Sequence, residues 1–405
     1  MKNQSNDDHE LLSRMGLRPV INAAGYPSRL GGTRLAPPVV AAMSAAARTF
    51  VPIAEMQARA SELIVELFGG EAGCVASGAD ACLALASAAC IAGEDLAAID
   101  RLPDTSGLRN EIVVHRAHRN SFDHALRLPG ARLVEFGYLG PASGVGAYHW
   151  QMHAAFTERT AASFYVDAPM NWVIDFKSFA AISHEHGVPV IVDAAPTQLP
   201  PENFRRWLDL GADLVACAGG KYIGGPAASG FLVGRRDLVR AATIQQQDTF
   251  IHPAVYQRPL TEADAGPHEP PHQGIGRVLK VGREELAGLI AALQLCSSRD
   301  YEEERQRASA LARSLTDAVN GPGHKGITAK RDDASNVVVV SFPTEQDTAR
   351  AVHALQEGSP RIFAGNTRIT QKEIALIPHA VTPEEAGPLQ ERLVNVIADI
   401  AHARG

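Results

Sequence analysis

Cysteines, aromatic residues and long apolar runs are scarce in this sequence. Its 405 residues include five cysteines and 6% aromatic residues. No two cysteines form a CxxC pair, and Cys82 and Cys90 would lie about 12 Å apart in one predicted helix, too far for a disulfide. We therefore expect free thiols in a reducing compartment, and no metal site. The five cysteines are Cys74, Cys82, Cys90, Cys217 and Cys296.

Targeting signals and basic blocks are also missing. No stretch approaches the roughly 18 uninterrupted apolar residues of a membrane span. The first ten residues, MKNQSNDDHE, have neither the basic start nor the apolar core of a signal peptide. The net charge of −7, without a Lys/Arg block, argues against an obligate nucleic-acid partner. We expect a cytoplasmic protein with neither a membrane nor a nucleic-acid partner.

Short runs rich in Val and Ile alternate with helical patterns over most of the chain. This alternation predicts an α/β fold with a mostly parallel sheet covered on both faces. We predict an N-terminal segment, 1–25, that packs on the core, a large domain, 26–282, and a small C-terminal α/β domain, 283–405. The predicted strands of the large domain are Gly73–Ser77, Ile112–Val114, Arg132–Phe136, Ser163–Val166, Val188–Asp193, Asp213–Ala218 and Gly230–Val233.

Two further segments bear on this organisation. Thr249–Gly274 contains five prolines and is predicted to be a long surface loop of the kind that forms lids or binding loops. The segment from Arg283 to Arg313 is predicted to be one helix, after which the small domain has a strand at Asn336–Phe342.

Asp193 ends the apolar run Val188-Pro-Val-Ile-Val-Asp193. A buried strand that ends in Asp puts a carboxylate at the carboxyl edge of the sheet, where open α/β sheets bind their ligands. The alternative is an Asp that caps a helix or a loop.

A second strand runs into the glycine-rich loop Gly219-Gly-Lys221-Tyr222-Ile-Gly-Gly225. Glycine is retained where the backbone must bend sharply or approach another group closely, so this lysine is a candidate for chemistry. A phosphate-binding P-loop is not matched, because Tyr222 stands where that motif has Ser or Thr. An anion-binding lysine and a surface lysine stay open as alternatives.

The third element is the turn Ser77-Gly78-Ala79-Asp80 between a strand and a helix. A helix N-terminus offers free N–H groups and a favourable dipole to an anion. Ser77 and Asp80 also fit a capping box, which needs no ligand.

In this order, the three elements are the minimum set for binding pyridoxal 5′-phosphate (PLP). The turn would take the phosphate, Asp193 would keep the pyridine nitrogen protonated, and Lys221 would form the Schiff base and then act as acid and base. This constellation is specific to fold type I PLP enzymes.

Long runs of the sequence resemble the selenocysteine synthase-like family, and look most like its D-glucosaminate-6-phosphate ammonia-lyase branch. They include INAAGYPSRLGGTRLAPPVV, LFGGEAGCVASGADACLALASAACIAGED, VPVIVDAAP, LGADLVACAGGKYIGGPAASGFLVGRRDL and IGRVLKVGREELAGLIAAL. The resemblance implies PLP as cofactor, Lys221 as its lysine, Asp193 as the pyridine partner, and the turn Ser77, Gly78, Ala79 and Asp80, with Gly219, as further cofactor contacts. It also implies a homodimer or larger homo-oligomer.

The sequence departs from the family in three places. Family members usually have Ser-Gly-x-Lys at the lysine loop, where this chain has Ala218-Gly-Gly-Lys221. Asp80 stands where close relatives tend to have a small apolar residue, and the loop before IGRVLK is longer than expected. The last two departures put the substrate in doubt.

Other candidates depend on analogy with fold type I enzymes. His118 is predicted to stack on one face of the pyridine ring, and Ala195 on the other, where plain core packing is the alternative. A zinc site of His115, His118 and His124 lacks a fourth ligand and the usual spacing. Arginine and lysine side chains can hold a substrate carboxylate or phosphate, and the candidates are Arg29, Arg277, Lys280 and Arg368.

The resemblance implies α,β-elimination from an amino acid or amino sugar acid, with or without a phosphate group, which releases ammonia and a 2-keto acid. Racemisation or epimerisation is the alternative and needs a second acid/base, for which His118 and Tyr222 are candidates. A tRNA-dependent selenium transferase is disfavoured, because the family-like sequence starts near Arg18 and leaves no room for an N-terminal tRNA-binding domain. A non-catalytic binding protein is disfavoured because Lys221 and Asp193 are both present.

Overall fold

A computed structural model describes residues 10–140, 144–168, 170–247, 251–257, 259–260, 269–271, 273–321, 324 and 326–403. The chain divides into two compact units. The large unit is Thr33–Arg299, and the small unit combines Met1–Gly32 with Asp300–Gly405.

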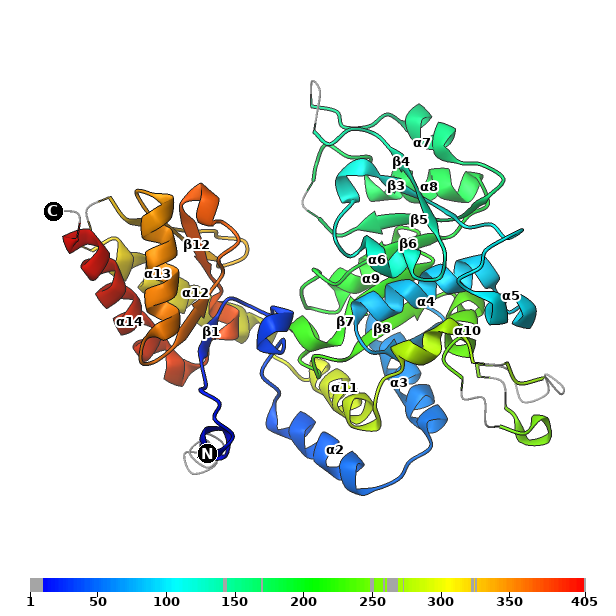
Figure 1. The fold of residues 1–405 in the computed structure, drawn as a ribbon, viewed down its shortest axis with the longest axis horizontal. Helices are drawn as coiled ribbons and strands as arrows, with labels where there is room; N and C mark the ends of the chain where they lie inside the picture. The colour runs from blue at the N-terminus through cyan, green and yellow to red at the C-terminus, as the bar shows by residue number, and fades with distance from the viewer. Residues whose placement is uncertain are drawn as a thin grey trace. The chain divides into compact units, whose positions relative to one another are not determined.

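The large unit is built on a sheet of seven strands in the order β2-β8-β7-β6-β5-β3-β4 (Figure 1). All neighbouring strands are parallel except β8, which is antiparallel to both β2 and β7. The predicted mostly parallel sheet is therefore confirmed, and each predicted strand overlaps one in the structure. The strands are β2 (Ala72–Ala76), β3 (Glu111–His115), β4 (Arg132–Phe136), β5 (Thr160–Val166), β6 (Val190–Asp193), β7 (Leu214–Ala218) and β8 (Gly230–Gly234).

Helices cover both faces of this sheet because its strands are apolar on both faces. In β3, Val113 joins one hydrophobic core, whereas Ile112 and Val114 join the other. The first core is covered by α2 (Pro37–Arg48), α3 (Ile53–Phe68), α7 (His149–Ala155), α8 (Phe176–Glu185), α9 (Glu202–Asp209) and α11 (Arg283–Cys296). The second is covered by α4 (Ala79–Ala92), α5 (Leu96–Arg101), α6 (Asp123–Arg127) and α10 (Arg236–Ile244).

The predicted single helix from Arg283 to Arg313 is two helices, and this moves the boundary between the units. Helix α11 ends at Cys296, and α12 (Tyr301–Val319) begins after Asp300, whose side chain accepts the Glu303 N–H at 2.9 Å as an N-cap. Helix α11 buries its apolar face against α2 and α3. It therefore belongs to the large unit, and the boundary lies at 299/300, whereas the sequence prediction put it at 282/283.

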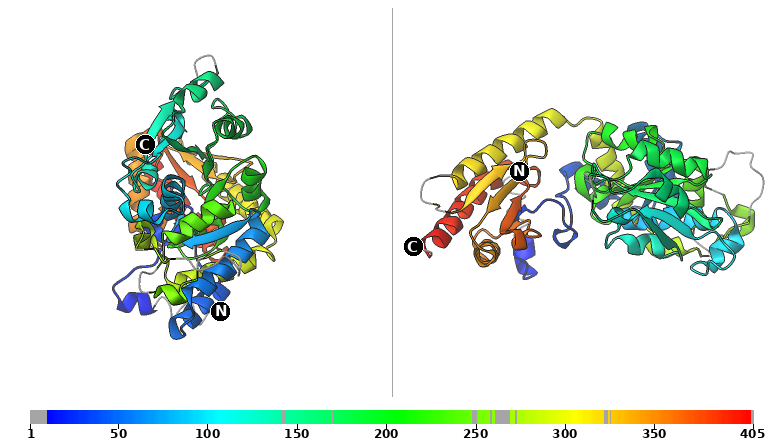
Figure 2. Two further views of the ribbon diagram at one scale, coloured as in Figure 1. Left: turned by 90° about the vertical axis from the view of Figure 1, so that its right-hand side faces the viewer. Right: turned by 90° about the horizontal axis from the view of Figure 1, so that it is seen from above.

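The small unit contains both ends of the chain. Strand β1 (Ile21–Ala23) pairs in parallel with β11 (Ile362–Ala364), so the N-terminal segment joins the small unit. A second sheet has the order β12-β10-β9 and is antiparallel. Its strands and the helices that share a core with them are β9 (Thr328–Arg331), β10 (Val338–Ser341), β12 (Glu373–Leu376), α12, α13 (Glu345–Glu357) and α14 (Pro383–His402), drawn yellow to red in Figure 2.

The predicted loop Thr249–Gly274 lies partly outside the described residues, which omit 249–250, 258, 261–268 and 272. Its described part has a short 3-10 helix, Pro253–Val255. Across the described ranges, every helix is too short or too polar to cross a membrane.

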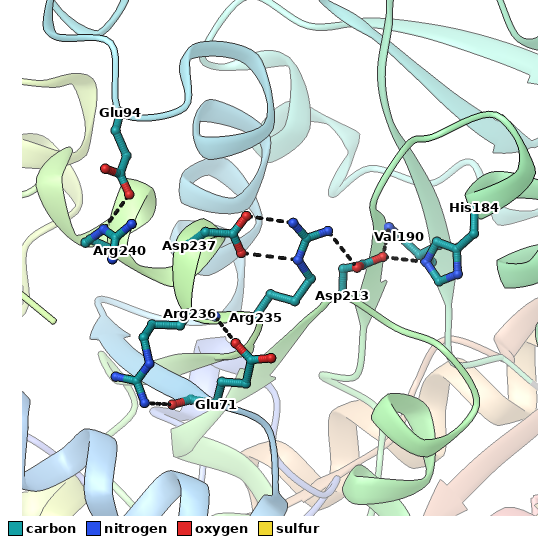
Figure 3. Close-up of polar contacts among 9 residues, drawn as sticks. All are labelled: Glu71, Glu94, His184, Val190, Asp213, Arg235, Arg236, Asp237 and Arg240. Carbon is teal, nitrogen blue, oxygen red and sulfur yellow. Dashed lines mark hydrogen bonds and ion pairs between the residues drawn. The ribbon is translucent and has the colours of Figure 1, made fainter. Parts of the chain in front are cut away.

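Asp213 joins three structural elements at the amino end of β7 (Figure 3). Its carboxylate accepts the Val190 N–H at 2.8 Å, lies 2.8 Å from His184 Nε2 and accepts from Arg235 at 3.1 Å. The side chain is only 9% exposed. Because a buried donor without an acceptor is costly, this carboxylate should stabilise the amino edge of the sheet.

We expect Asp213→Ala to lower the free energy of unfolding by about 2–4 kcal/mol, because three donors lose their acceptor. The matched control is Asp237→Ala, because Asp237 also pairs with Arg235 but its side chain is 52% exposed. An exposed pair of this kind contributes about 1 kcal/mol or less. Urea unfolding followed by circular dichroism measures both variants. Equal losses would contradict a special role of Asp213.

Candidate functional site

Three predicted site elements meet at the carboxyl edge of the large sheet. Ala76 of β2 and Ala218 of β7 both pair with Gly230 of β8. Asp193, the last residue of β6, pairs with Ala216 of β7. The turn after β2, the loop after β7 and the Asp193 carboxylate therefore come to one edge, as predicted for a ligand site of an open α/β sheet.

The turn after β2 ends in an uncapped helix N-terminus. Gly78 is the N-cap of α4, and no side chain caps the helix. The predicted alternative, a capping box of Ser77 and Asp80, is not formed. It needs Ser77 as the N-cap, whereas the N-cap of α4 is Gly78, one residue later. The first N–H groups of a helix have no partners within it. Those of α4 are therefore available to an anion such as a phosphate.

Asp193 is buried, with 5% of its surface exposed. Its Oδ1 accepts the Ala195 N–H at 3.0 Å, and the described residues provide no other hydrogen bond to this side chain. Burial raises the pKa of Asp193, and the charge of Lys221 partly opposes that rise. A buried carboxylate with so few partners is suited to a cationic partner, and a protonated pyridine nitrogen would be one.

Lys221 lies in the segment Gly219–Ile223, which follows β7, and is half-buried. Its positive charge partly offsets the burial that raises the pKa of both Asp80 and Asp193. In the described part of the chain, its amine forms no hydrogen bond and no ion pair. An amine that is close to two carboxylates but forms an ion pair with neither is suited to a covalent imine.

Comparisons with known proteins agree with this geometry. A family model for Cys/Met metabolism PLP-dependent enzymes matches residues 146–257, which include Asp193 and Lys221. A 5′-C-glycyluridine monooxygenase-decarboxylase of Streptomyces sp is 32% identical over 95% of this chain and 91% of that protein. The D-glucosaminate-6-phosphate ammonia lyase of Salmonella typhimurium is 29% identical over 95% of this chain and 96% of that protein. A solved D-glucosaminate-6-phosphate ammonia-lyase is 28% identical, with a TM-score of 0.78, over 96% of this chain and 99% of that chain.

L-seryl-tRNA(Sec) selenium transferase of Edwardsiella ictaluri is 28% identical over 55% of this chain and 44% of that protein. This chain belongs to the selenocysteine synthase-like family. It is a PLP-dependent enzyme with the fold type I architecture, so the predicted family, fold and cofactor are confirmed. The free N–H groups of α4, the buried Asp193 carboxylate and the uncommitted Lys221 amine fit PLP.

Close packing explains why glycine occupies the two positions before Lys221. A Cβ on Gly219 would lie 2.3 Å from Ser229 Oγ, and one on Gly220 would lie 2.5 Å from Ala227 Cα. The loop can therefore fold tightly under Lys221 only with glycine at both positions. The predicted contact of Gly219 with PLP stays a prediction.

Gly230 was missed by the sequence reasoning, although it lies against the turn Ser77–Asp80 and pairs with Ala218, the residue before the loop of Lys221. A Cβ on Gly230 would lie 2.4 Å from the carbonyl carbon of Gly78 and 2.7 Å from the Ala79 nitrogen. Because Gly230 has no side chain, the turn Ser77–Asp80 can pack directly against β8. A glycine in a strand often marks such a close approach, and this was the available signal.

We expect Gly230→Ala to weaken PLP binding by about tenfold or more, because the added methyl group must displace the turn that offers N–H groups to the phosphate. The control is Gly387→Ala in α14, where a Cβ meets no atom within 4 Å. Spectroscopic titration of the apoenzyme with PLP measures both dissociation constants. Unchanged affinity in Gly230→Ala would mean that this turn does not hold the phosphate.

His118 lies in a buried position after β3. It is 2% exposed, and its ring is edge-on to Tyr165 at 4.4 Å between centroids. Among the described residues, neither ring nitrogen has a hydrogen-bond partner. Burial lowers the pKa of His118 to about 3, with a smaller effect from His115. The imidazole is therefore neutral at physiological pH. Among the described residues, no group of three or more His, Cys, Asp or Glu side chains could hold a metal ion. His115, His118 and His124 therefore do not form such a group.

The remaining cofactor candidates flank Asp193 and Lys221. Ala195 is half-buried two residues after Asp193, and its N–H donates to that carboxylate. Asp80 is exposed in the first turn of α4, and partial burial of its carboxyl raises its pKa. Their stacking and phosphate-side roles stay predictions.

The four predicted substrate residues divide between the two units. The Ser77 N–H donates to the Leu279 carbonyl at 3.2 Å, which brings the segment of Arg277 and Lys280 to the phosphate turn. Arg29 and Arg368 belong to the small unit. There Arg29 donates to Asn366 at 3.4 Å, and Arg368 pairs with Glu373 at 3.3 Å.

Proposed function

We propose that this enzyme catalyses α,β-elimination from a polyhydroxylated amino acid, with release of ammonia and a 2-keto acid. PLP held by Lys221 supplies an electron sink at the substrate Cα. Lys221 would hold PLP through its amine and would act as the base that takes the substrate Cα proton. Asp193 would face the pyridine nitrogen and keep it protonated, and the N-terminus of α4 would bind the phosphate.

The observation that carries elimination over racemisation is the state of the candidate second bases. Racemisation requires a second acid/base on the opposite face of the substrate. The pKa of His118 is lowered to about 3 by burial, which makes it a poor base at neutral pH. Burial raises the pKa of Tyr222, so its hydroxyl stays protonated. Of the three candidates His118, Tyr222 and Lys221, we therefore favour Lys221 as the base.

Two relatives support a substrate class. Glucosaminate 6-phosphate is an amino acid with a hydroxylated carbon chain, and 5′-C-glycyluridine carries a glycyl group on the sugar of a nucleoside. We therefore infer an amino acid joined to a sugar-like chain. Arg277 and Lys280, whose segment contacts the turn Ser77–Asp80, are the candidates for binding its acidic groups within the large unit. The roles of Arg29 and Arg368 in the small unit stay predictions.

Oxidative decarboxylation is the second candidate. The observation in its favour is the 32% identity, over 95% of this chain, to a monooxygenase-decarboxylase. Both reactions break a bond at Cα with the help of the same electron sink. They differ in the bond that breaks and in the need for O2.

The test is a substrate panel on the PLP-loaded enzyme, with and without O2. D-glucosaminate 6-phosphate, D-glucosaminate, 5′-C-glycyluridine and both serine enantiomers are suitable. Ammonia and keto acid formed equally in both atmospheres support elimination. Consumption of O2 with release of CO2 selects the second candidate. Loss of optical rotation without keto acid would contradict both.

A further inference from the structure

The large unit has a cavity of about 620 Å³. This volume is in the range of small-molecule pockets. Its lining combines polar residues, which we call the polar wall, with apolar residues, which we call the apolar floor. They come from the loops after β5 and β6 and from α8 and α9. Those that matter here are Asp167, Phe176, Thr197, Asn203, Arg206 and Trp207.

The cavity is lined in part by residues that directly follow β5 and β6, and β6 is the strand that ends at Asp193. The backbone N–H of Asp167 donates to the Asp193 carbonyl at 3.0 Å. The segment that begins with the predicted cofactor contact Ala195 continues directly into the wall residue Thr197. The cavity wall and the anchor of the pyridine nitrogen are therefore parts of the same two loops.

The polar wall is organised before any ligand arrives. Thr197 is 4% exposed; its hydroxyl donates to the Asp167 carboxylate and accepts from the Trp207 indole N–H at 3.4 Å. Arg206 lies 3.5 Å from the other oxygen of Asp167, and its guanidinium covers the Trp207 ring at 4.6 Å. The single carboxylate and the single guanidinium of the wall therefore balance each other.

We propose that this cavity binds the neutral, polyhydroxylated part of the substrate. A ligand charge would be left without a partner, because Asp167 and Arg206 already compensate each other. Hydroxyl groups can both donate to Asp167 and accept from Arg206 or Asn203, and a carboxylate is a common partner of the hydroxyls of a sugar. The C–H face of a sugar then lies on the apolar floor formed by Phe176 and Trp207. This inference deepens the proposed function and rests on it.

The experiment measures sugar binding directly, without turnover. Methyl β-D-ribofuranoside, which has a vicinal diol, and its 2-deoxy analogue are titrated into the PLP-loaded enzyme while tryptophan fluorescence is recorded. Trp207 lines the cavity, whereas Trp150 and Trp172 do not. We expect saturable binding of the ribofuranoside, about tenfold weaker binding of the deoxy analogue, and similar losses in Asp167→Asn and Asn203→Ala. Asp209→Asn, the same change at an exposed residue of α9, should leave the affinity unchanged.

Each result decides the inference independently of the reaction. Absence of saturable binding, or equal affinity in wild type and both cavity variants, would overturn it. Tighter binding of ribose 5-phosphate or glucosamine than of the neutral sugar would also overturn it, because the cavity would then select a charge. Sugar binding by an enzyme that eliminates nothing would keep the cavity assignment and remove the proposed function. Elimination without sugar binding would do the reverse.

Discussion

Replacement of Lys221 by alanine should reduce turnover of any amino acid by at least about 10³-fold. The variant would lose both the proposed covalent anchor of PLP and the proposed base for the Cα proton, and general acid–base catalysis alone contributes about 10² to 10⁴-fold. Steady-state kinetics on the substrate identified by the panel measure the loss. Added methylamine should restore part of the rate, since it replaces the missing amine.

The site of attachment has its own readout. Borohydride reduction of the holoenzyme followed by peptide mass spectrometry should place the pyridoxyl group on Lys221. Lys177→Ala, which removes an exposed lysine of α8, is the matched control and should keep both the label and full activity. A pyridoxyl group on another lysine, or full turnover by Lys221→Ala, would remove the proposed mechanism.

The large sheet was predictable because its strands carry their signal locally. Parallel strands covered on both faces are short apolar runs, and helical patterns separate them. Val190–Asp193 and Leu214–Ala218 fit this description, so the sequence alone was enough to bring Asp193 and the loop of Lys221 to one edge. The family of the chain is confirmed, whereas the roles of individual side chains stay predictions.

The parts that were missed depend on contacts between distant segments. The three-residue strand β1 exists because it pairs with β11, more than 300 residues later, and no local pattern indicates such a partner. The end of α11 is set by the surface of α2 and α3 that it covers, and by the cap at Asp300 that starts α12. The sequence showed only a continuous helical pattern there.

The cavity and Gly230 were missed for a related reason. Asp167, Thr197 and Arg206 come from two loops and a helix, and only the fold shows that they share one wall. In the sequence, Gly230 is an ordinary strand residue. Its role depends on Gly78, which lies so close that a Cβ on Gly230 would overlap it. Exposed arginines such as Arg29 and Arg368 cannot be assigned from sequence, because solvated arginines are common.

Replacement of Asp193 by asparagine should separate catalysis from stability. In the proposed site, a pyridine nitrogen without this carboxylate would lose its proton, and the cofactor would be a weaker electron sink. We expect turnover to fall by about a hundred- to a thousand-fold, the range found when one preorganised electrostatic partner is removed. Asp347→Asn, at a carboxylate that is also 5% exposed but lies in the small unit, should leave PLP affinity unchanged.

The apoenzyme should respond to the same change in the opposite direction. Burial raises the pKa of Asp193 above its value in the unfolded chain, so the ionised form costs folding free energy above that raised pKa. Below the unfolded pKa of about 3.9, both states are protonated and the cost is absent. Apo Asp193→Asn should therefore melt at a higher temperature than the apo wild type near pH 7, and this advantage should disappear as the pH falls toward 4.

PLP should raise the melting temperature of the wild type more than that of the variant, because only the wild type would pair its carboxylate with a pyridinium. An apo variant less stable than the apo wild type at pH 7 would mean that Asp193 is already paired within the protein, and its assignment to the cofactor would fail.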